Sequence, residues 1–116
     1  MRHMDEFYHL MHDIVERDVL VVVEGKKDAR ALREFGARRI LELDTVYTTV
    51  ESIDEKEVVL LVDLDKEGRK MYARLNDELS RRGVTVNNRL RHYLFKETKI
   101  RQIEGLRRYF GKDYSW

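Results

Sequence analysis

Acidic side chains follow two of the most apolar segments of the chain, and carboxylates at such positions are suited to metal-ion and phosphate chemistry. Glu24 comes directly after the apolar run at 19–23, and Asp63 and Asp65 follow the run at 58–62. Carboxylate oxygens on a short turn suit Mg²⁺, which keeps several waters and often lies between carboxylates and substrate phosphates. Carboxylates this close also repel one another, which raises their pKa values or demands a counter-cation. If the two runs are parallel strands, we expect a magnesium site at their shared edge.

A purely structural interpretation of the same acids stays open. Acidic residues after strands often cap helices, so Asp65 could cap the helix that follows and Glu24 could simply be exposed. For one such acid alone, capping is the favoured explanation. Two acidic clusters after two strands favour a shared site instead, with Asp28 as a candidate fourth carboxylate.

The apolar pattern places these acids in an α/β fold. Short β-branched runs predict strands at 19–23, 39–43, 58–62 and 84–86. Apolar residues at helical spacing predict helices at 4–17, 26–35, 68–82 and, in two parts, about 88–110, the second part capped by Thr98. Residues 44–57 form either one short helix capped by Thr48 or a loop. Alternating strands and helices predict a mostly parallel four-stranded sheet with helices on both faces. Ligands bind beyond the carboxyl ends of the strands in such sheets.

Length and composition exclude several classes of protein. A chain of 116 residues fits one domain, so we expect residues 1–116 to form a single unit with a motif core at 19–86. The absence of cysteine excludes disulfides and thiolate metal sites. The longest purely apolar runs, at 19–23 and 58–62, are far too short to span a membrane, and no signal peptide is recognisable. We expect a cytoplasmic protein without a membrane partner, and the sequence leaves its oligomeric state open.

Positive charge is concentrated at the end of the chain. Residues 81–116 contain ten Lys and Arg residues against three acids, although the whole chain has a net charge of only +1. An acidic first part beside a basic last part suits a metal site next to a phosphate-binding surface. Solvated helix faces explain the same charges about equally well. The candidate phosphate or nucleic-acid ligands are Lys26, Lys27, Arg69, Arg89, Arg91, Lys99 and Arg101.

Both acidic segments resemble the motifs of the Toprim family. VLVVVEGKKDARAL resembles the first motif, an apolar strand followed by Glu-Gly and by an acid three residues after the Gly. VVLLVDLDKEGRK resembles the second, an apolar strand followed by Asp-x-Asp-x-x-Gly. The resemblance covers residues 19–86 and implies a Toprim-like, Rossmann-like fold. Toprim domains occur in primases, topoisomerases, old-family nucleases, recombination proteins, a ribonuclease that matures small ribosomal RNA, and small free-standing proteins of this length.

The resemblance also implies roles for individual residues. Glu24 matches the family's general acid/base and metal ligand, and Asp63 and Asp65 match its Mg²⁺-binding pair. Gly25 and Gly68 match its turn glycines. Asp28, in turn, matches a frequent accessory acid. The sequence shows no region for a topoisomerase tyrosine, no primase zinc module and no ATPase motif, so those activities are not expected.

The implied function is Mg²⁺-dependent phosphoryl-transfer chemistry on nucleic acid, with Mn²⁺ as an alternative ion. By analogy with the maturation ribonuclease, the expected activity is cleavage of structured RNA or DNA. A non-catalytic Toprim module that binds nucleic acid or a partner protein is the alternative. A receiver-like phosphoacceptor domain is a third interpretation, disfavoured because Asn87 and Asn88 stand where such domains carry a lysine.

Overall fold

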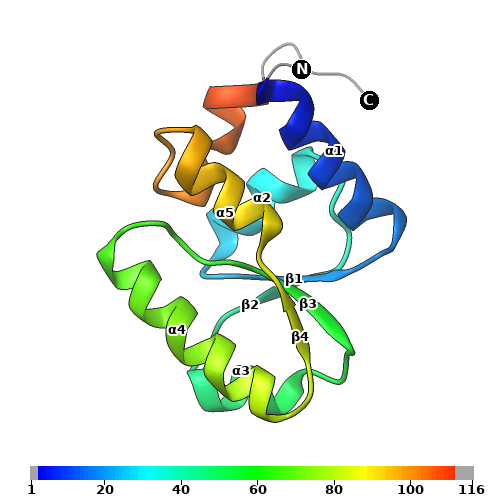
Figure 1. Cartoon of the computed structure of the whole chain (residues 1–116), viewed down its shortest axis with the longest axis vertical. Helices are drawn as coiled ribbons and strands as arrows, with labels where there is room; N and C mark the ends of the chain where they lie inside the picture. Colours follow the sequence, from blue (N-terminus) through cyan, green and yellow to red (C-terminus); the bar gives the residue numbers. More distant parts are fainter. Residues whose placement is uncertain (1–2, 112–116) are drawn as a thin grey trace.

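A computed structural model describes residues 3–111, with side chains for residues 6–110. Four parallel strands form the centre of the molecule (Figure 1). Their order across the sheet is β2-β1-β3-β4. The strands are β1 Leu20–Val23, β2 Ile40–Glu42, β3 Glu57–Leu61 and β4 Thr85–Asn87. The helices are α1 His3–Glu16, α2 Lys26–Glu34, α3 Val46–Ser52, α4 Lys66–Arg81 and α5 Arg89–Glu97. The predicted α/β fold with an all-parallel, Rossmann-like sheet is therefore confirmed.

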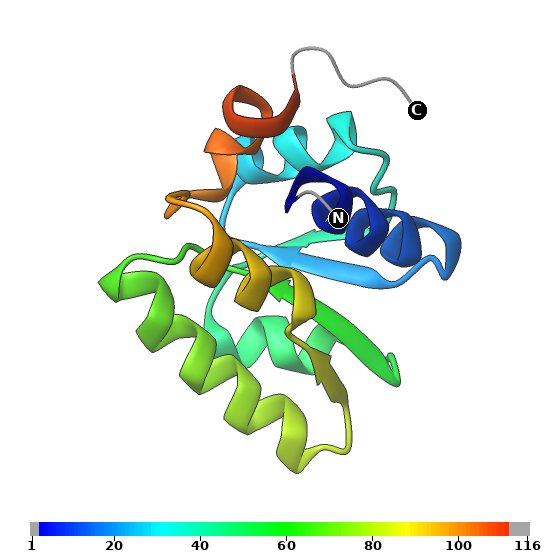
Figure 2. The ribbon, with the colours of Figure 1, turned by 45° about the horizontal axis from the view of Figure 1, so that its top comes forward.

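Helices cover both faces of the sheet, as Figure 2 shows with α3 and α4 on one side and α1, α2 and α5 on the other. Side chains alternate along β1: Val21 and Val23 pack with the α1 side, whereas Val22 packs with the α3 and α4 side. Strands buried on both faces need apolar residues at every position. This explains why the two central strands are continuously apolar, β1 throughout and β3 from Val58 on, instead of alternating with polar residues.

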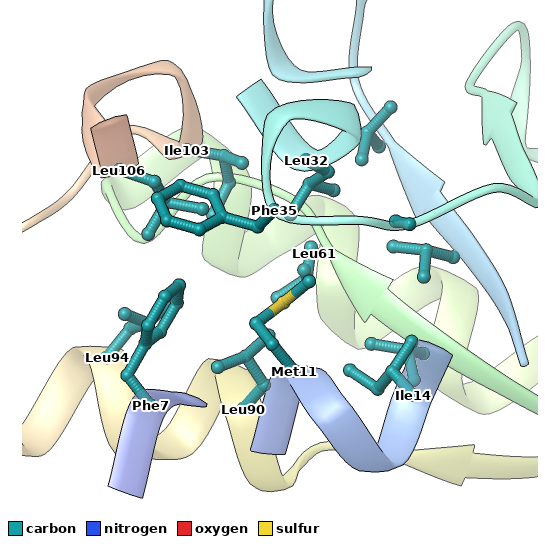
Figure 3. Close-up of a cluster of buried hydrophobic side chains, with 14 of the residues drawn as sticks. Phe7, Met11, Ile14, Leu32, Phe35, Leu61, Leu90, Leu94, Ile103 and Leu106 are labelled. Carbon is teal, nitrogen blue, oxygen red and sulfur yellow. The ribbon is translucent and has the colours of Figure 1, made fainter. Parts of the chain in front are cut away.

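The larger core lies between the sheet and the α1 side (Figure 3). Phe7 from α1 stacks on Phe110 at a ring-centroid distance of 3.9 Å and meets Phe35 edge-to-face at 5.1 Å. Leu94 of α5 and Ile103 are fully buried in the same cluster. The two ends of the described chain are thus joined through one core, although they lie outside the region covered by the motifs.

The structure resolves the weakest part of the sequence pattern. Residues 46–52 form a short helix, α3, and its cap is Thr45 instead of Thr48. The Thr45 hydroxyl accepts a hydrogen bond from the Thr48 backbone N–H at 3.0 Å. Side-chain oxygens at this position satisfy N–H groups that a helix start leaves free.

The predicted final helix capped by Thr98 is wrong. The buried Thr98 hydroxyl bonds the Leu94 carbonyl at 2.6 Å and ends α5. A 3₁₀ turn at Ile103–Gly105 and a π turn at Arg107–Gly111 follow, and the apolar residues of this segment are nevertheless buried. The physical reason is that the loop after β3 uses the segment's backbone groups: Leu64 N–H donates to the Arg101 carbonyl at 2.7 Å.

Chain topology places a switch point between the two central strands, β1 and β3. The chain leaves β1 for β2 on one side and then returns past β1 to form β3 and β4 on the other. Strand order therefore reverses between β1 and β3, and ligands of open α/β sheets bind outside the carboxyl ends of strands at such points. Separately, among the described residues no helix is both long and apolar enough to cross a membrane.

Candidate functional site

Glu24 and Asp63 meet at this switch point. The β1–β3 register pairs Val23 with Leu61, so Glu24 and the residues after Leu61 leave the sheet at the same edge. The half-buried Glu24 carboxylate accepts a hydrogen bond from the Asp63 backbone N–H through Oε2, at 2.7 Å. The sequence prediction that the two acidic segments share one edge is therefore confirmed.

Asp65 begins helix α4. Its Oδ1 accepts a hydrogen bond from the Gly68 N–H at 2.8 Å, as an N-cap residue does. The interpretation of Asp65 as a helix cap is thus confirmed. It does not exclude a second role, because the capping bond occupies one carboxylate oxygen only.

Each of the three acids has one oxygen bonded to the backbone. Asp63 Oδ1 accepts a hydrogen bond from the Ile103 N–H at 2.9 Å. In the same way, Glu24 accepts from the Asp63 N–H, and Asp65 accepts from the Gly68 N–H. Among the side chains that the structure describes, the second oxygen of each carboxylate makes no hydrogen bond. These bonds fix the orientation of the acids and leave one oxygen of each for another partner.

Burial and like charge both raise the pKa values of Glu24 and Asp63. The pKa of Glu24 is raised first by burial and further by the Asp63 and Asp65 charges, while the Asp63 N–H lowers it. The pKa of Asp63 is raised by burial and by the charges of Asp65 and Glu104, against the Ile103 N–H. The expected rise is present, but burial is its largest cause. A bound cation would relieve both effects.

The donor set fits an ion held by few protein oxygens. Within the described part of the chain, no three His, Asp or Glu side chains are already arranged around a metal position. Glu24, Asp63 and Asp65 are therefore neighbours and not a closed cage. Mg²⁺ is commonly bound through one or two carboxylates and several waters. The free oxygens of Asp63 and Asp65 would suffice for that mode, and three-acid ligation stays a prediction.

Asp28 lies behind these acids as a buried carboxylate. Its side chain is 6% exposed and accepts a hydrogen bond from the Gly25 N–H at 3.3 Å. Burial and the neighbouring charge of Asp63 raise its pKa to about 6. The candidate accessory acid therefore does belong to the cluster, with its charge disfavoured by the fold.

The two turn glycines differ in what the fold asks of them. A Cβ added at Gly68 would overlap the backbone carbonyl of Asp63, so α4 can approach the acidic loop this closely only with glycine there. Gly25 is extended, with φ −160°, and a Cβ there would meet nothing within 4 Å. The fold therefore does not require glycine at position 25. It does require glycine at position 68, because two backbones approach each other closely there.

Arg91 anchors the acidic loop and is not a free phosphate ligand. Its guanidinium donates to the Val62 carbonyl at 3.2 Å and to the Asp63 carbonyl at 2.9 Å. Its Cζ also lies 4.4 Å from the centre of the Tyr72 ring. Arg91 thus ties α5 to the loop after β3 and places a positive charge near Glu24 and Asp63. The sequence pattern identified the residue but not this role.

The other predicted cations divide into two groups. Lys26 and Lys27 are exposed in the first turn of α2, and Arg69 is exposed in the first turn of α4. Lys99 and Arg101 line a depression that also includes Asp65. All five therefore lie on elements that begin or end near the acidic loop.

Arg89 is the exception. It contacts Asp13 at 3.4 Å and Asn87 at 3.5 Å. Asn87 donates to Glu57, the first residue of β3, and Asp13 pairs with Arg17, which also contacts Glu57. Because Glu57 marks the amino end of that strand, Arg89 lies away from the acids. Its predicted contact with nucleic acid stays a prediction, since spacing along α5 does not show how far each residue of the helix lies from the acids.

Contacts from the C-terminal segment were missed by sequence reasoning. The Ile103 N–H donates to the Asp63 carboxylate, and the Arg101 carbonyl accepts from the Leu64 N–H, so this segment lies directly on the acidic loop. Apolar spacing predicted that Ile103 is buried, but backbone contacts leave no mark in a sequence.

Comparison with known proteins supports the fold along nearly the whole chain. The chain is 30% identical to a UPF0292 protein of Methanocaldococcus jannaschii, over 93% of this chain and 95% of that protein. The chain belongs to the UPF0292 family. It is also 26% identical to a UPF0292 protein of Archaeoglobus fulgidus, over 91% of this chain and 90% of the relative.

A solved structure of a putative protein from Aquifex aeolicus has the same fold as this chain. The TM-score is 0.78 at 28% identity, and the match covers 90% of this chain and 98% of the other. No family model matches the sequence. The match supports the same α/β architecture over almost the full length.

Asp28→Asn is expected to stabilise the UPF0292 fold near neutral pH. Because the pKa of Asp28 is about 6 in the folded protein against an ordinary 3.8, the folded state binds this proton more tightly than the unfolded chain. The contribution of Asp28 to stability is therefore largest at low pH and falls as pH rises from 3.8 to 6. Asparagine keeps an acceptor for Gly25 N–H without the charge, so we expect a gain of about 1–2 kcal/mol at pH 7.

Urea unfolding at pH 7 and at pH 5 measures this effect. The gain should shrink at pH 5, because wild-type Asp28 is then largely protonated in the folded state. The matched control is Glu67→Gln, since the Glu67 side chain is 84% exposed, and it should change stability by less than about 0.5 kcal/mol. A loss of stability in Asp28→Asn, or the same gain at both pH values, would contradict the assignment.

Proposed function

We propose that this protein is a small Toprim-type, Mg²⁺-dependent enzyme of the cytoplasm that cleaves phosphodiester bonds in structured RNA or DNA. The observation that carries the proposal is the hydrogen bond from Asp63 N–H to Glu24 at 2.7 Å. It joins the two Toprim-like segments at the point in the sheet where α/β proteins bind ligands. The same parallel topology and edge are what the resemblance implies.

The side chains of the cluster suit different tasks. Asp63 and Asp65 each keep one oxygen without a protein partner among the described side chains, and these oxygens would hold the ion. When bound, Mg²⁺ would neutralise phosphate charge and help to orient the attacking oxygen. Mn²⁺ has similar ligand preferences and would act in its place.

Glu24 is the candidate proton carrier. Burial and two neighbouring acids raise its pKa, which brings a carboxyl group closer to the pH at which it both gains and loses a proton readily. Its Oε2 is held by the Asp63 N–H, so the side chain is oriented while Oε1 is left for a substrate or a water. Glu24 would move a proton during phosphoryl transfer.

Positive side chains near the acids suit a polyanionic substrate. Lys99 and Arg101 line a depression together with Asp65 and Arg108. Lys26 and Lys27 stand at the start of α2, where the helix dipole also favours an anion. A phosphate chain that crosses the acidic edge would meet cations on both sides of it.

A non-catalytic binding module is the second candidate. The observation that favours it is that each of the three acids already serves a backbone N–H, and no closed metal cage is present among the described residues. In that case the acids would mainly shape the loops, and the cations would bind nucleic acid. The two functions differ in whether a covalent bond is broken.

End-labelled RNA and DNA, each as a hairpin and as a single strand, provide the test. Pure protein should shorten at least one of them when Mg²⁺ or Mn²⁺ is present, and EDTA should stop the reaction. Intact substrates at all metal concentrations, together with retained binding, would favour the binding module over the enzyme.

A further inference from the structure

Two aromatic side chains are exposed beside the acidic edge. Phe95 on α5 is 40% exposed and Tyr109 in the C-terminal segment is 45% exposed, whereas Phe7, Phe35, Tyr93 and Phe110 are buried. Tyr109 lines the same depression as Asp65. Large apolar groups on a surface often mark a binding site, and single ones need support from their surroundings.

Cations surround both aromatic residues. Arg101 Cζ lies 4.8 Å from the centre of the Phe95 ring, so a guanidinium already stacks on one part of this surface. The Asp65 depression, about 500 Å³ in volume, also contains Lys99 and Arg108. Phe95 lines a second depression of about 260 Å³ with Arg69 and Arg91.

The Phe95–Arg101 pair links the two depressions, because each depression contains one member of the pair. Around them the charged side chains are Lys99, Arg101, Arg108, Arg69 and Arg91, against the single carboxylate of Asp65. We call this region, made of Phe95, Tyr109, Lys99, Arg101, Arg108 and Arg69, the aromatic–basic surface. It combines π faces with positive charge and begins at a proposed metal ligand.

We propose that the aromatic–basic surface binds single-stranded nucleic acid, with bases on Phe95 and Tyr109 and phosphates on Lys99, Arg108 and Arg69. This inference rests on the proposed function, whose substrate it specifies. A single strand can turn the face of a base toward an aromatic ring, whereas a duplex keeps those faces stacked internally. Charge alone would bind a duplex equally well, so the exposed rings decide in favour of unpaired strands.

The position of the surface gives the binding a consequence for the reaction. Asp65 lies in the same depression as Tyr109, Lys99 and Arg108. A strand whose bases rest on Tyr109 and Phe95 therefore passes next to the acidic edge. In a structured RNA or DNA, the cleaved bond would lie in or beside an unpaired segment.

Fluorescence anisotropy with EDTA present measures binding without cleavage. Labelled single strands of DNA and of RNA, and the corresponding duplexes, are titrated with the full chain over a range of salt concentrations. We expect the single strands to bind at least about tenfold more tightly than the duplexes, because bases of an unpaired strand can stack on the exposed rings. The two single-strand arms distinguish RNA from DNA.

Two kinds of substitution separate stacking from charge. Phe95→Ala and Tyr109→Ala should each weaken single-strand binding about tenfold without changing its salt dependence, and Phe95→Tyr should restore most of it. Lys99→Gln and Arg108→Gln should instead each make the plot of log affinity against log salt concentration less steep, by slightly less than one unit of slope. Tyr47→Ala, on α3 with 69% of Tyr47 exposed, is the matched control and should leave affinity unchanged.

Equal affinity for single strands and duplexes, or a Phe95→Ala variant that binds like wild type, overturns the inference. If the protein then still cleaves duplexes in a metal-dependent way, the proposed enzyme function is supported although the single-strand inference is not. Preferential single-strand binding that depends on Phe95, with no cleavage under any metal condition, would support the inference while contradicting the enzyme.

Discussion

Glu24→Gln is expected to abolish cleavage, with a loss of about a hundredfold or more, while affinity for nucleic acid is retained. Glutamine keeps the shape of the side chain and an oxygen that can accept the Asp63 N–H bond seen at 2.7 Å. It cannot gain and lose a proton, and it carries no charge. Single-turnover cleavage and anisotropy binding, measured on the same preparation, separate the two effects.

Variants of other acids make this result specific. Asp63→Asn and Asp65→Asn should also lose activity, but high Mn²⁺ should partly restore it because their defect is weaker metal binding. Glu67→Gln removes one exposed carboxylate from the first turn of α4 and should cleave normally. If Glu24→Gln cleaves as fast as wild type, Glu24 is a structural acceptor for Asp63 and not a proton carrier.

Gly68→Ala is expected to lower the free energy of unfolding by about 3 kcal/mol. The added Cβ would overlap the Asp63 carbonyl group, and the overlapped atoms belong to backbone that cannot rotate away. Either α4 or the acidic loop must shift. Thermal unfolding should show a melting temperature lower by roughly 10 °C for a chain of this size. Metal-dependent activity should fall as well, because the shift moves Asp63 or Asp65.

Gly25→Ala provides the matched comparison. A Cβ at Gly25 meets nothing within 4 Å, and its φ of −160° suits any residue. Alanine is only a weaker helix cap there, so stability should change by less than about 1 kcal/mol. If the two alanine variants were equally stable, close packing of α4 on the Asp63 loop would not be what fixes Gly68.

Local patterns predicted the sheet and the acidic edge well, for reasons that the structure makes plain. The runs that form β1 and β3 are apolar throughout because both faces of the sheet are covered. Parallel pairing then forces Glu24 and Asp63 to one edge, whatever the rest of the chain does. Periodicity also identified Ile103, Leu106 and Phe110 as buried.

Long-range backbone contacts were outside the reach of such patterns. The segment after α5 was predicted as a helix because its apolar spacing is helical, yet its backbone instead bonds Asp63 and Leu64. Arg89 and Arg91 are two residues apart, but one lies at Asp13 and the other at the Asp63 carbonyl. The different positions of these two side chains depend on where α5 passes β3, which local spacing in the sequence does not determine.

Mn²⁺-induced broadening of backbone amide NMR signals tests most directly whether the acidic edge binds a divalent ion. At low Mn²⁺ concentration, the signals of Gly25, Asp63 and Leu64 should broaden first, and Asp65→Asn should need several times more metal for the same effect. Asp77 and Glu78 form an exposed acidic pair near the other end of α4 and should stay sharp under those conditions. Broadening that begins at Asp77 and Glu78, or that is unchanged in Asp65→Asn, would contradict a metal site at the carboxyl ends of β1 and β3.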